Sequence, residues 1–180
     1  MTQIRIHGRG GQGVVTAAEL IAIATFNDGK QAQAFPSFGV ERTGAPIEAF
    51  IRLSNKPIKT REQVYEPDIL IVLDASLLQS VDVAKGSKPN TKLIINTTKN
   101  KNKIKVSIDS ANIFTVDATK IALDIIGKNI ANTVTLGALA KDTGIVSLDG
   151  LKTAIKQKFA EKDKDIMAKN IKAITEAYKK

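Results

Sequence analysis

Apolar and polar residues follow two different periods along the chain, and together they predict strands in alternation with helices. The first segment, "TQIRIH", is typical of a strand, and "VVTAAELIAIATF" is typical of a helix that begins after Gly13 and ends at the turn "NDG", with Asn27 and Gly29. This helix is apolar almost all round, as expected of a helix that is covered on both sides. We therefore expect a sheet beneath it and another element above it.

The rest of the chain continues the alternation. Further strands are predicted in "KQAQAF", "APIEAFIRLS", "PDILIVLD", "TKLIINTT" and "NIFTVDA", and further helices in "TKIALDIIGK", "NTVTLGALAKDTG", "SLDGLKTAIKQKFA" and "DKDIMAKNIKAITEAYKK". The continuous apolar runs in residues 67–74 and 91–98 are typical of buried parallel strands. This order predicts an α/β protein with a mostly parallel sheet and helices on both faces, and with ligands at the carboxyl ends of the strands.

Length and composition narrow the class of protein. The chain has 180 residues and 43% apolar content, so we expect residues 1–180 to form a single domain. It has no cysteine, which excludes a disulfide and a cysteine-ligated iron–sulfur cluster in this chain and fits a reducing, cytoplasmic setting. No apolar run is long enough for a membrane span or a signal sequence, so we expect no membrane contact.

The net charge of +9 is concentrated in two lysine-rich stretches. Residues 85–105 contain 7 lysines and no acid, and the chain from Leu151 onward contains 9 lysines and 4 acids. Lysine clusters without aromatic residues between them, and without arginine after Arg61, are a poor nucleic-acid signature. They indicate a solvated face or a surface for an acidic partner, and we expect no nucleic acid to bind.

The turn between the first strand and the first helix carries the most distinctive motif. Gly8, Gly10 and Gly13 fit G-x-G-x-x-G in the strand-to-helix setting that the motif requires. Glycines there permit a tight turn, a close approach of an anionic group and close packing of helix on strand, while the helix N-terminus offers free N–H groups. Arg9 would add a positive charge to such a site, and Gln12 an amide donor.

Half of the dinucleotide fingerprint is missing, however. An acidic residue is expected at the end of the second strand to hold the ribose hydroxyls, but that strand ends in "AQAFPSFG", and Asp28 comes before it. The motif therefore leaves two interpretations open. It is either an anion-binding turn for something other than a complete NAD, or a structural turn that binds no small molecule.

The stretch "FPSFGVERTGAP", residues 35–46, is predicted to be a shaped loop after the second strand. It is either packed internally, or Phe35 and Phe38 anchor an interface while Ser37, Arg42 and Thr43 contact a ligand or a neighbouring subunit.

Residues with catalytic chemistry are scarce. His7, the single histidine, precedes the glycines in a strand and is expected to be a packed or capped side chain rather than a base. Asp74 and Asn96 follow predicted strands and are expected to be strand-end caps, although such positions also line the crevice of an α/β sheet. The last predicted helix has an apolar stripe at helical spacing that indicates core or interface packing, and it consists of Met167, Ile171, Ile174 and Tyr178. We predict no catalytic residue and no metal ligand.

Three stretches together resemble the gamma subunit, or gamma domain, of pyruvate:ferredoxin/flavodoxin oxidoreductase in the 2-oxoacid:acceptor oxidoreductase family. They are "GRGGQGVVTAAELIA", "FPSFGVERTGAPIEAFIRLS" and "PDILIVLDASLL". The resemblance extends over nearly the whole chain, with a further match at "NTVTLGALA". It implies a single Rossmann-like gamma domain.

The resemblance also implies a subunit of a larger enzyme, pyruvate synthase, and not a catalyst in isolation. Such complexes convert pyruvate and coenzyme A to acetyl-CoA, CO2 and reduced acceptor with thiamine diphosphate, Mg²⁺ and [4Fe-4S] clusters. The cofactors belong to the alpha, beta and delta subunits, so this chain is expected to hold none and to contribute to assembly and to a contact with coenzyme A.

The resulting prediction for the site is a coenzyme-A-facing surface at the glycine turn and the loop that follows the second strand. Its predicted residues are Gly8, Arg9, Gly10, Gly11, Gln12, Gly13, Ser37, Arg42 and Thr43. Two other functions stay open from the sequence: a stand-alone nucleotide- or CoA-binding module, and a small NAD(P)-dependent oxidoreductase.

Overall fold

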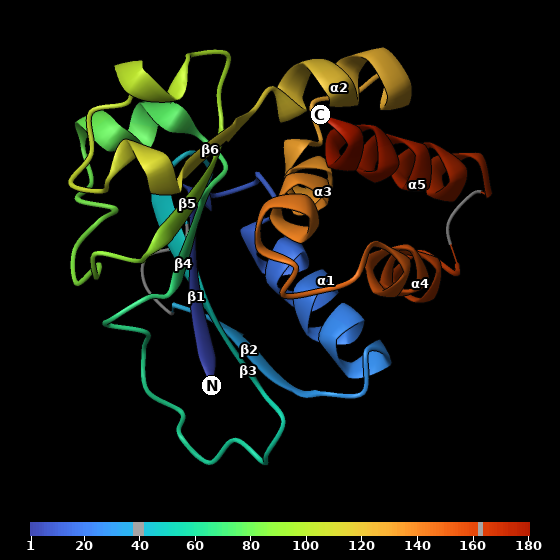
Figure 1. Ribbon diagram of the computed structural model, residues 1–180. Coiled ribbons are helices and arrows are strands. Elements are labelled where there is room, and N and C mark those ends of the chain that lie inside the picture. Colours follow the sequence, from blue (N-terminus) through green and yellow to red (C-terminus); the bar gives the residue numbers. More distant parts are fainter. Residues whose placement is uncertain (38–41, 162–163) are drawn as a thin grey trace.

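The fold is an α/β domain with one sheet and a layer of helices packed on it (Figure 1). The computed structural model describes residues 1–37, 42–161 and 164–180. The strands are β1 (Thr2–Arg9), β2 (Gln31–Pro36), β3 (Pro46–Ser54), β4 (Ile69–Val72), β5 (Lys92–Asn96) and β6 (Ile113–Val116). The α-helices are α1 (Val14–Asn27), α2 (Ala118–Ile126), α3 (Ala131–Thr143), α4 (Leu148–Lys158) and α5 (Lys164–Lys179). The described residues also form three 3₁₀ helices: η1 (Ala75–Gln79), η2 (Lys101–Lys103) and η3 (Ser110–Asn112).

The six strands follow the order β2-β3-β1-β4-β5-β6. β1, β4, β5 and β6 pair in parallel, whereas β3 lies between β2 and β1 and is antiparallel to both. The prediction of a mostly parallel sheet is therefore confirmed, including the two buried parallel strands β4 and β5. The chain moves from β1 to one side of the sheet first and to the other side afterwards, so the carboxyl ends of β1 and β4 lie at the point where the direction of winding changes.

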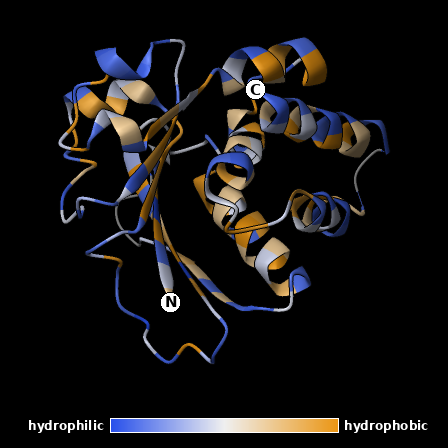
Figure 2. Ribbon diagram, viewed as in Figure 1, coloured by the Kyte–Doolittle hydropathy of each residue, from blue (hydrophilic) through white to orange (hydrophobic). Residues whose placement is uncertain are grey.

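The two faces of the sheet have separate apolar cores because side chains alternate along each strand. In β4, Ile69 and Ile71 belong to the larger core under the helices, whereas Leu70 and Val72 belong to a smaller core on the opposite face. Figure 2 shows the apolar residues gathered in the central strands and in the helices beside them.

The α-helices all lie on one face, and the other face is covered by 3₁₀ helices and irregular chain (Figure 1). The connections after β4 and β5 contribute Leu77, Val83, Ile104, Val106 and other apolar side chains to this second core. The expected helices on both faces are thus α-helices on one side and short 3₁₀ helices on the other. These connections are rich in Lys, Asn, Ser, Pro and Gly, which do not favour a long amphipathic helix.

The first helix is covered on both sides, as its apolar surface predicts. It packs against β2 and β3 below and against α4 and α3 above, and Leu20, Ile21 and Ala24 are fully buried. Three members of the predicted apolar stripe of α5 are confirmed as packing, since Ile174 is buried and Met167 and Ile171 lie against the same core. The fourth member, Tyr178, is instead exposed at the C-terminal end of the helix. No helix within the described residues is long and apolar enough to cross a membrane.

Candidate functional site

The glycine turn joins β1 to α1 and is held against the chain that enters β3. The Gly10 N–H donates to the Ala45 carbonyl at 2.8 Å, and the Gly44 N–H donates to the Gly10 carbonyl at 3.0 Å. A Cβ on Gly10 would lie 2.3 Å from the Arg42 carbonyl oxygen. Gly13 has a φ of +75°, and a Cβ there would lie 2.3 Å from Asn132 Nδ2. Only a residue without a side chain allows these contacts, so the turn requires glycine at both positions.

We expect Gly10→Ala to lower the free energy of unfolding by about 2–3 kcal/mol, because the colliding atom belongs to the backbone and cannot rotate away. Chemical denaturation of the isolated chain measures the loss. Gly29→Ala is the control: Gly29 has a φ of +78°, and no atom of the described residues lies within 4 Å of a Cβ there, so its cost is about 1 kcal/mol. Equal losses for the two variants would contradict the close approach at Gly10.

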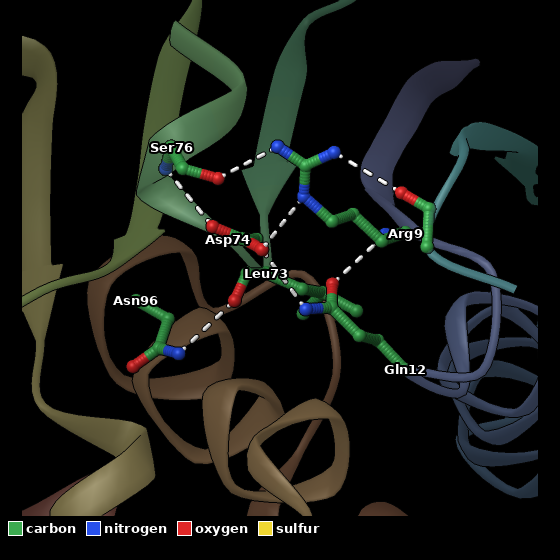
Figure 3. Close-up of polar contacts among 7 residues, drawn as sticks. Arg9, Gln12, Leu73, Asp74, Ser76 and Asn96 are labelled. Atoms are coloured by element: carbon green, nitrogen blue, oxygen red, sulfur yellow. Dashed lines mark hydrogen bonds and ion pairs between the residues drawn. The ribbon is translucent and has the colours of Figure 1, made fainter.

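Arg9 and Gln12 converge on Asp74, which follows β4 (Figure 3). Arg9 Nε donates to Asp74 Oδ2 at 3.1 Å, and Gln12 Nε2 donates to the same oxygen at 3.0 Å. The other Arg9 nitrogens donate to Ser76 Oγ at 2.8 Å and to the Gly44 carbonyl at 3.1 Å. The positive charge of Arg9 is therefore balanced by Asp74, on the β4 side of the turn.

The carboxyl of Asp74 is held in its ionised form. Partial burial acts to raise its pKa, but hydrogen bonds from Ser76 and Gln12 and the charge of Arg9 outweigh burial and leave the pKa below its ordinary value. Asp74 also accepts a hydrogen bond from the Ser76 N–H at 2.9 Å and so caps η1. The expected role of Asp74 as a cap is confirmed.

A cavity of about 410 Å³ lies between the glycine turn and the β2–β3 side of the sheet, and we name it the turn cavity. It is lined by Gly10, Gly11, Gly13, Val14, Val15, Pro36, Ser37, Arg42, Thr43, Ile47 and Glu48. The structure thus brings six of the nine predicted site residues together: Gly10, Gly11, Gly13, Ser37, Arg42 and Thr43. Gly8 is instead buried in packing, where a Cβ would lie 2.4 Å from Val14 Cγ2.

The N-terminus of α1 forms one wall of the turn cavity. Gly13 caps the helix without a side-chain hydrogen bond, and the first turn contains no acidic residue. Among the bonds of the described residues, the first N–H inside the helix to find a helical partner is that of Ala17, which donates to the Gly13 carbonyl at 2.9 Å. The preceding N–H groups and the positive end of the helix dipole favour an anionic group.

A second cavity of about 410 Å³ lies on the other side of the turn, at the carboxyl ends of the parallel strands, and we name it the strand-end cavity. Its polar lining consists of Gln12, Asp74, Ser76, Asn96, Thr97, Thr98, Asp117, Thr119, Asn129 and Asn132. Asn96 Nδ2 donates to the Leu73 carbonyl at 3.0 Å and to Thr119 Oγ1 at 2.9 Å, so Asn96 ties β4 and α2 together at the strand ends.

Sequence reasoning placed Asp74 and Asn96 at this crevice but missed Asn132, Asp117 and Thr119. Asp117 and Thr119 follow β6 directly, so the rule of strand carboxyl ends could have found them. Asn132 comes from the first turn of α3 and donates to the Gly13 carbonyl at 3.1 Å across 119 residues of sequence. No local pattern signals such a contact.

His7 belongs to a buried network on the face of the sheet away from the α-helices. Its Nε2 accepts a hydrogen bond from Arg5 Nε at 3.1 Å, and its Nδ1 lies 3.2 Å from Glu48 Oε1. Since Arg5 can only donate, Nδ1 carries the proton and donates to Glu48. Burial, followed by the charge of Arg5, lowers the pKa of His7 to about 3. The imidazole is neutral and packed, as expected, and the contact with Glu48 is a hydrogen bond rather than an ion pair.

Phe35, the described aromatic residue of the predicted loop, belongs to β2 and is half-buried. The Phe35 ring lies 5.5 Å from that of Phe50, and the guanidinium of Arg52 lies 5.9 Å from the centre of the Phe35 ring. Phe38, the other predicted anchor, lies outside the described residues. Across the described ranges, no three His, Cys, Asp or Glu side chains lie close enough together to hold a metal ion.

Comparison with known proteins shows which family this chain is similar to. Residues 3–180 match the family model described as pyruvate ferredoxin/flavodoxin oxidoreductase. Pyruvate synthase subunit PorC of Methanosarcina barkeri is 56% identical over 156 residues, which are 87% of this chain and 85% of that one. The common subunit gamma of the pyruvate/ketoisovalerate oxidoreductases of Pyrococcus furiosus is 50% identical over 182 residues, covering 100% of this chain and 97% of that one.

A solved structure shows the same fold. The crystal structure of pyruvate oxidoreductase subunit PORC from Thermotoga maritima superposes with a TM-score of 0.86 at 37% identity, covering 99% of this chain and 96% of that one. The matches extend over the glycine turn, the loop before β3 and the helices alike.

Proposed function

Because this chain belongs to the pyruvate ferredoxin/flavodoxin oxidoreductase family, we propose that it is the gamma subunit of a multi-subunit pyruvate oxidoreductase and performs no chemistry of its own. The complex would convert pyruvate and coenzyme A to acetyl-CoA, CO2 and reduced ferredoxin or flavodoxin. The observation that carries the proposal is the match over nearly the full length of chains that are themselves named as subunits.

The proposal assigns the redox chemistry to the partner subunits, alpha, beta and delta. Thiamine diphosphate with Mg²⁺ would cleave the 2-oxoacid, and [4Fe-4S] clusters would carry the electrons. The residues of this chain do not fit those groups, since it has no cysteine to ligate iron and its single histidine is engaged by Arg5 and Glu48. A chain without cysteine also suits the cytoplasm, where the proposal places the complex.

The proposal assigns a contact with coenzyme A to the turn cavity. A phosphate of coenzyme A would lie at the uncapped N-terminus of α1, where the glycines leave the backbone open. Arg42 is exposed at the rim and would add a charge-assisted hydrogen bond to a phosphate oxygen. Ser37 and Thr43 line the same cavity and would supply hydroxyl groups. Arg9 would act indirectly, since it positions Gln12 and the turn through Asp74.

Replacing Arg42 by alanine in the assembled complex is expected to raise the apparent KM for coenzyme A by roughly threefold to tenfold, with KM for pyruvate unchanged, because one phosphate contact is lost. Steady-state kinetics with each substrate varied in turn measures this effect. Arg61→Ala is the matched control, because Arg61 is also exposed but lies outside the turn cavity. An unchanged KM for coenzyme A in an intact Arg42→Ala complex would exclude the contact at Arg42.

Affinity purification of this chain with a tag, from the organism that expresses it, tests the subunit assignment. We expect three further polypeptides in fixed stoichiometry, one of them with bound thiamine diphosphate and at least one with iron–sulfur clusters. A chain that purifies alone would contradict the assignment and favour a stand-alone nucleotide- or CoA-binding module. A clear calorimetric isotherm for NAD with the isolated chain would instead favour a small NAD(P)-dependent oxidoreductase.

A further inference from the structure

The connection from β5 to β6 carries a row of lysines that the proposed function does not use. This segment, residues 97–112, leads from β5 to the edge strand β6 and includes η2 and η3 (Figure 1). Between Lys85 and Lys105 the sequence contains 7 lysines and no acidic residue. We name four of them the lysine ribbon: Lys99, Lys101, Lys103 and Lys105.

The backbone under the lysine ribbon is fixed by local hydrogen bonds. The Lys99 N–H donates to Thr97 Oγ1 at 3.2 Å, and the Asn102 N–H donates to Asn100 Oδ1 at 3.0 Å, which caps η2. Further along, the Ala111 N–H donates to Asp109 Oδ1 at 2.8 Å and caps η3. The segment is therefore a shaped support and not a free loop.

Alternation along the same segment turns the apolar residues inward and the lysines outward. Ile104, Val106 and Ile108 are partly buried against the smaller apolar core of the sheet. Lys103 and Lys105, which alternate with them, are exposed, as are Lys99 and Lys101. None of the four ammonium groups makes an ion pair with a carboxylate of the described residues, whereas Lys88, Lys120, Lys152, Lys158 and Lys169 each do.

We propose that the lysine ribbon is a docking surface for an acidic protein. Four unpaired positive charges on an anchored segment of seven residues create a local field that attracts a surface rich in Asp and Glu. Such a field raises the rate of encounter and selects partners by charge, even though each exposed contact contributes little affinity by itself.

The residue types favour a protein over the other polyanions. The segment 97–109 contains no arginine and no aromatic residue, and these are the side chains that grip phosphates in two-point contacts and stack on bases. Its apolar residues Ile104, Val106 and Ile108 face the core, so the segment offers a membrane no apolar face to insert. The lysine ammonium is a compact charge on a flexible stem, so it can follow a carboxylate on a flexible Asp or Glu side chain.

Binding of labelled poly-L-glutamate to the full chain, followed by fluorescence anisotropy at low salt, tests the proposal. The variant K99Q/K101Q/K103Q/K105Q is expected to bind roughly tenfold more weakly than the natural chain. The matched control K156Q/K164Q/K172Q/K179Q removes four exposed lysines from α4 and α5, and it is expected to lose less than threefold. Because all eight lysines are exposed, both variants should keep the circular dichroism spectrum of the natural chain.

Three results would overturn the proposal. The first is an equal loss in both variants, which would show that affinity follows net charge and not the lysine ribbon. The second is tighter binding of duplex DNA or of vesicles with anionic lipid than of poly-L-glutamate at the same salt concentration, with that binding lost in the ribbon variant. The third is an absence of poly-L-glutamate binding by the natural chain.

Discussion

Acidification from pH 6.5 to pH 3 is expected to lower the free energy of unfolding by up to about 5 kcal/mol through His7 alone. The folded-state pKa of His7 is about 3 and its ordinary value is 6.5. Between those two values the unfolded chain binds a proton at His7 and the folded chain does not, so unfolding becomes more favourable as the pH falls. The loss is about 1.4 kcal/mol for each pH unit.

Chemical denaturation at several pH values between 7 and 4.5 measures this slope. The chain has one histidine, so His7→Gln is expected to abolish most of the slope in this range. Asp142 has a raised pKa, because burial outweighs the charges of Lys141 and Lys92, and it acts with the opposite sign. Asp74, with its lowered pKa, adds a further loss of stability only at about pH 4 and below. A slope that persists in His7→Gln would contradict the neutral, buried state of His7.

The second large effect is expected at Arg5, whose replacement by methionine should cost about 3–5 kcal/mol of unfolding free energy. Arg5 is 6% exposed, and its guanidinium donates to the carbonyls of Val64, Val83 and Lys85 at 3.1, 3.0 and 2.6 Å. It thereby fastens two irregular connections to the face of the sheet opposite the α-helices. Methionine fills a similar volume but leaves these carbonyls without a donor.

Urea denaturation of Arg5→Met and of the control Arg61→Met measures the loss of unfolding free energy in each. The difference between the two losses is the part that comes from the buried contacts of Arg5, because both variants replace an arginine by methionine. Arg61 is exposed, so its replacement should change the unfolding free energy by less than about 0.5 kcal/mol. Arg5→Lys is expected to recover little of the loss, because one ammonium cannot reach three separate carbonyls. A loss below about 1 kcal/mol in Arg5→Met would show that the connections are held by other contacts.

The glycine turn was predictable because its requirements are local. The strand pattern, the glycines and the helix pattern follow one another directly in the sequence. Gly13 has the left-handed backbone that such a turn needs. The expectation that the turn does not bind a complete dinucleotide rests on the missing acid after the second strand and stays a prediction. The family resemblance, carried by the turn and the loop after it, is confirmed by the match over residues 3–180.

The rest of the site depends on contacts between residues far apart in the sequence. No residue near Arg9 in the sequence predicts that Arg9 will pair with Asp74, which is 65 residues away. No residue near Gly13 predicts that the side-chain amide of Asn132 will donate to the Gly13 carbonyl. The same holds for the three backbone carbonyls that accept hydrogen bonds from Arg5, which lie 59 to 80 residues away. Its side-chain partner His7 is near in sequence, but that pair does not predict the carbonyl contacts.

The antiparallel direction of β3 also depends on contacts between segments that are apart in the sequence. The segment "APIEAFIRLS" was predicted to be a strand, but its direction follows from pairing with both β1 and β2. This pairing places Glu48 opposite His7 and brings the loop before β3 against Gly10. The turn cavity is a consequence of that topology.

A gamma subunit without chemistry of its own has activity only within its complex. Reduction of methyl viologen by the assembly purified through a tag on this chain tests that assignment. We expect dye reduction that requires both pyruvate and coenzyme A, and none from the isolated chain with the same substrates. Reduction of the dye by the isolated chain, or an assembly that is inactive with both substrates, would contradict it.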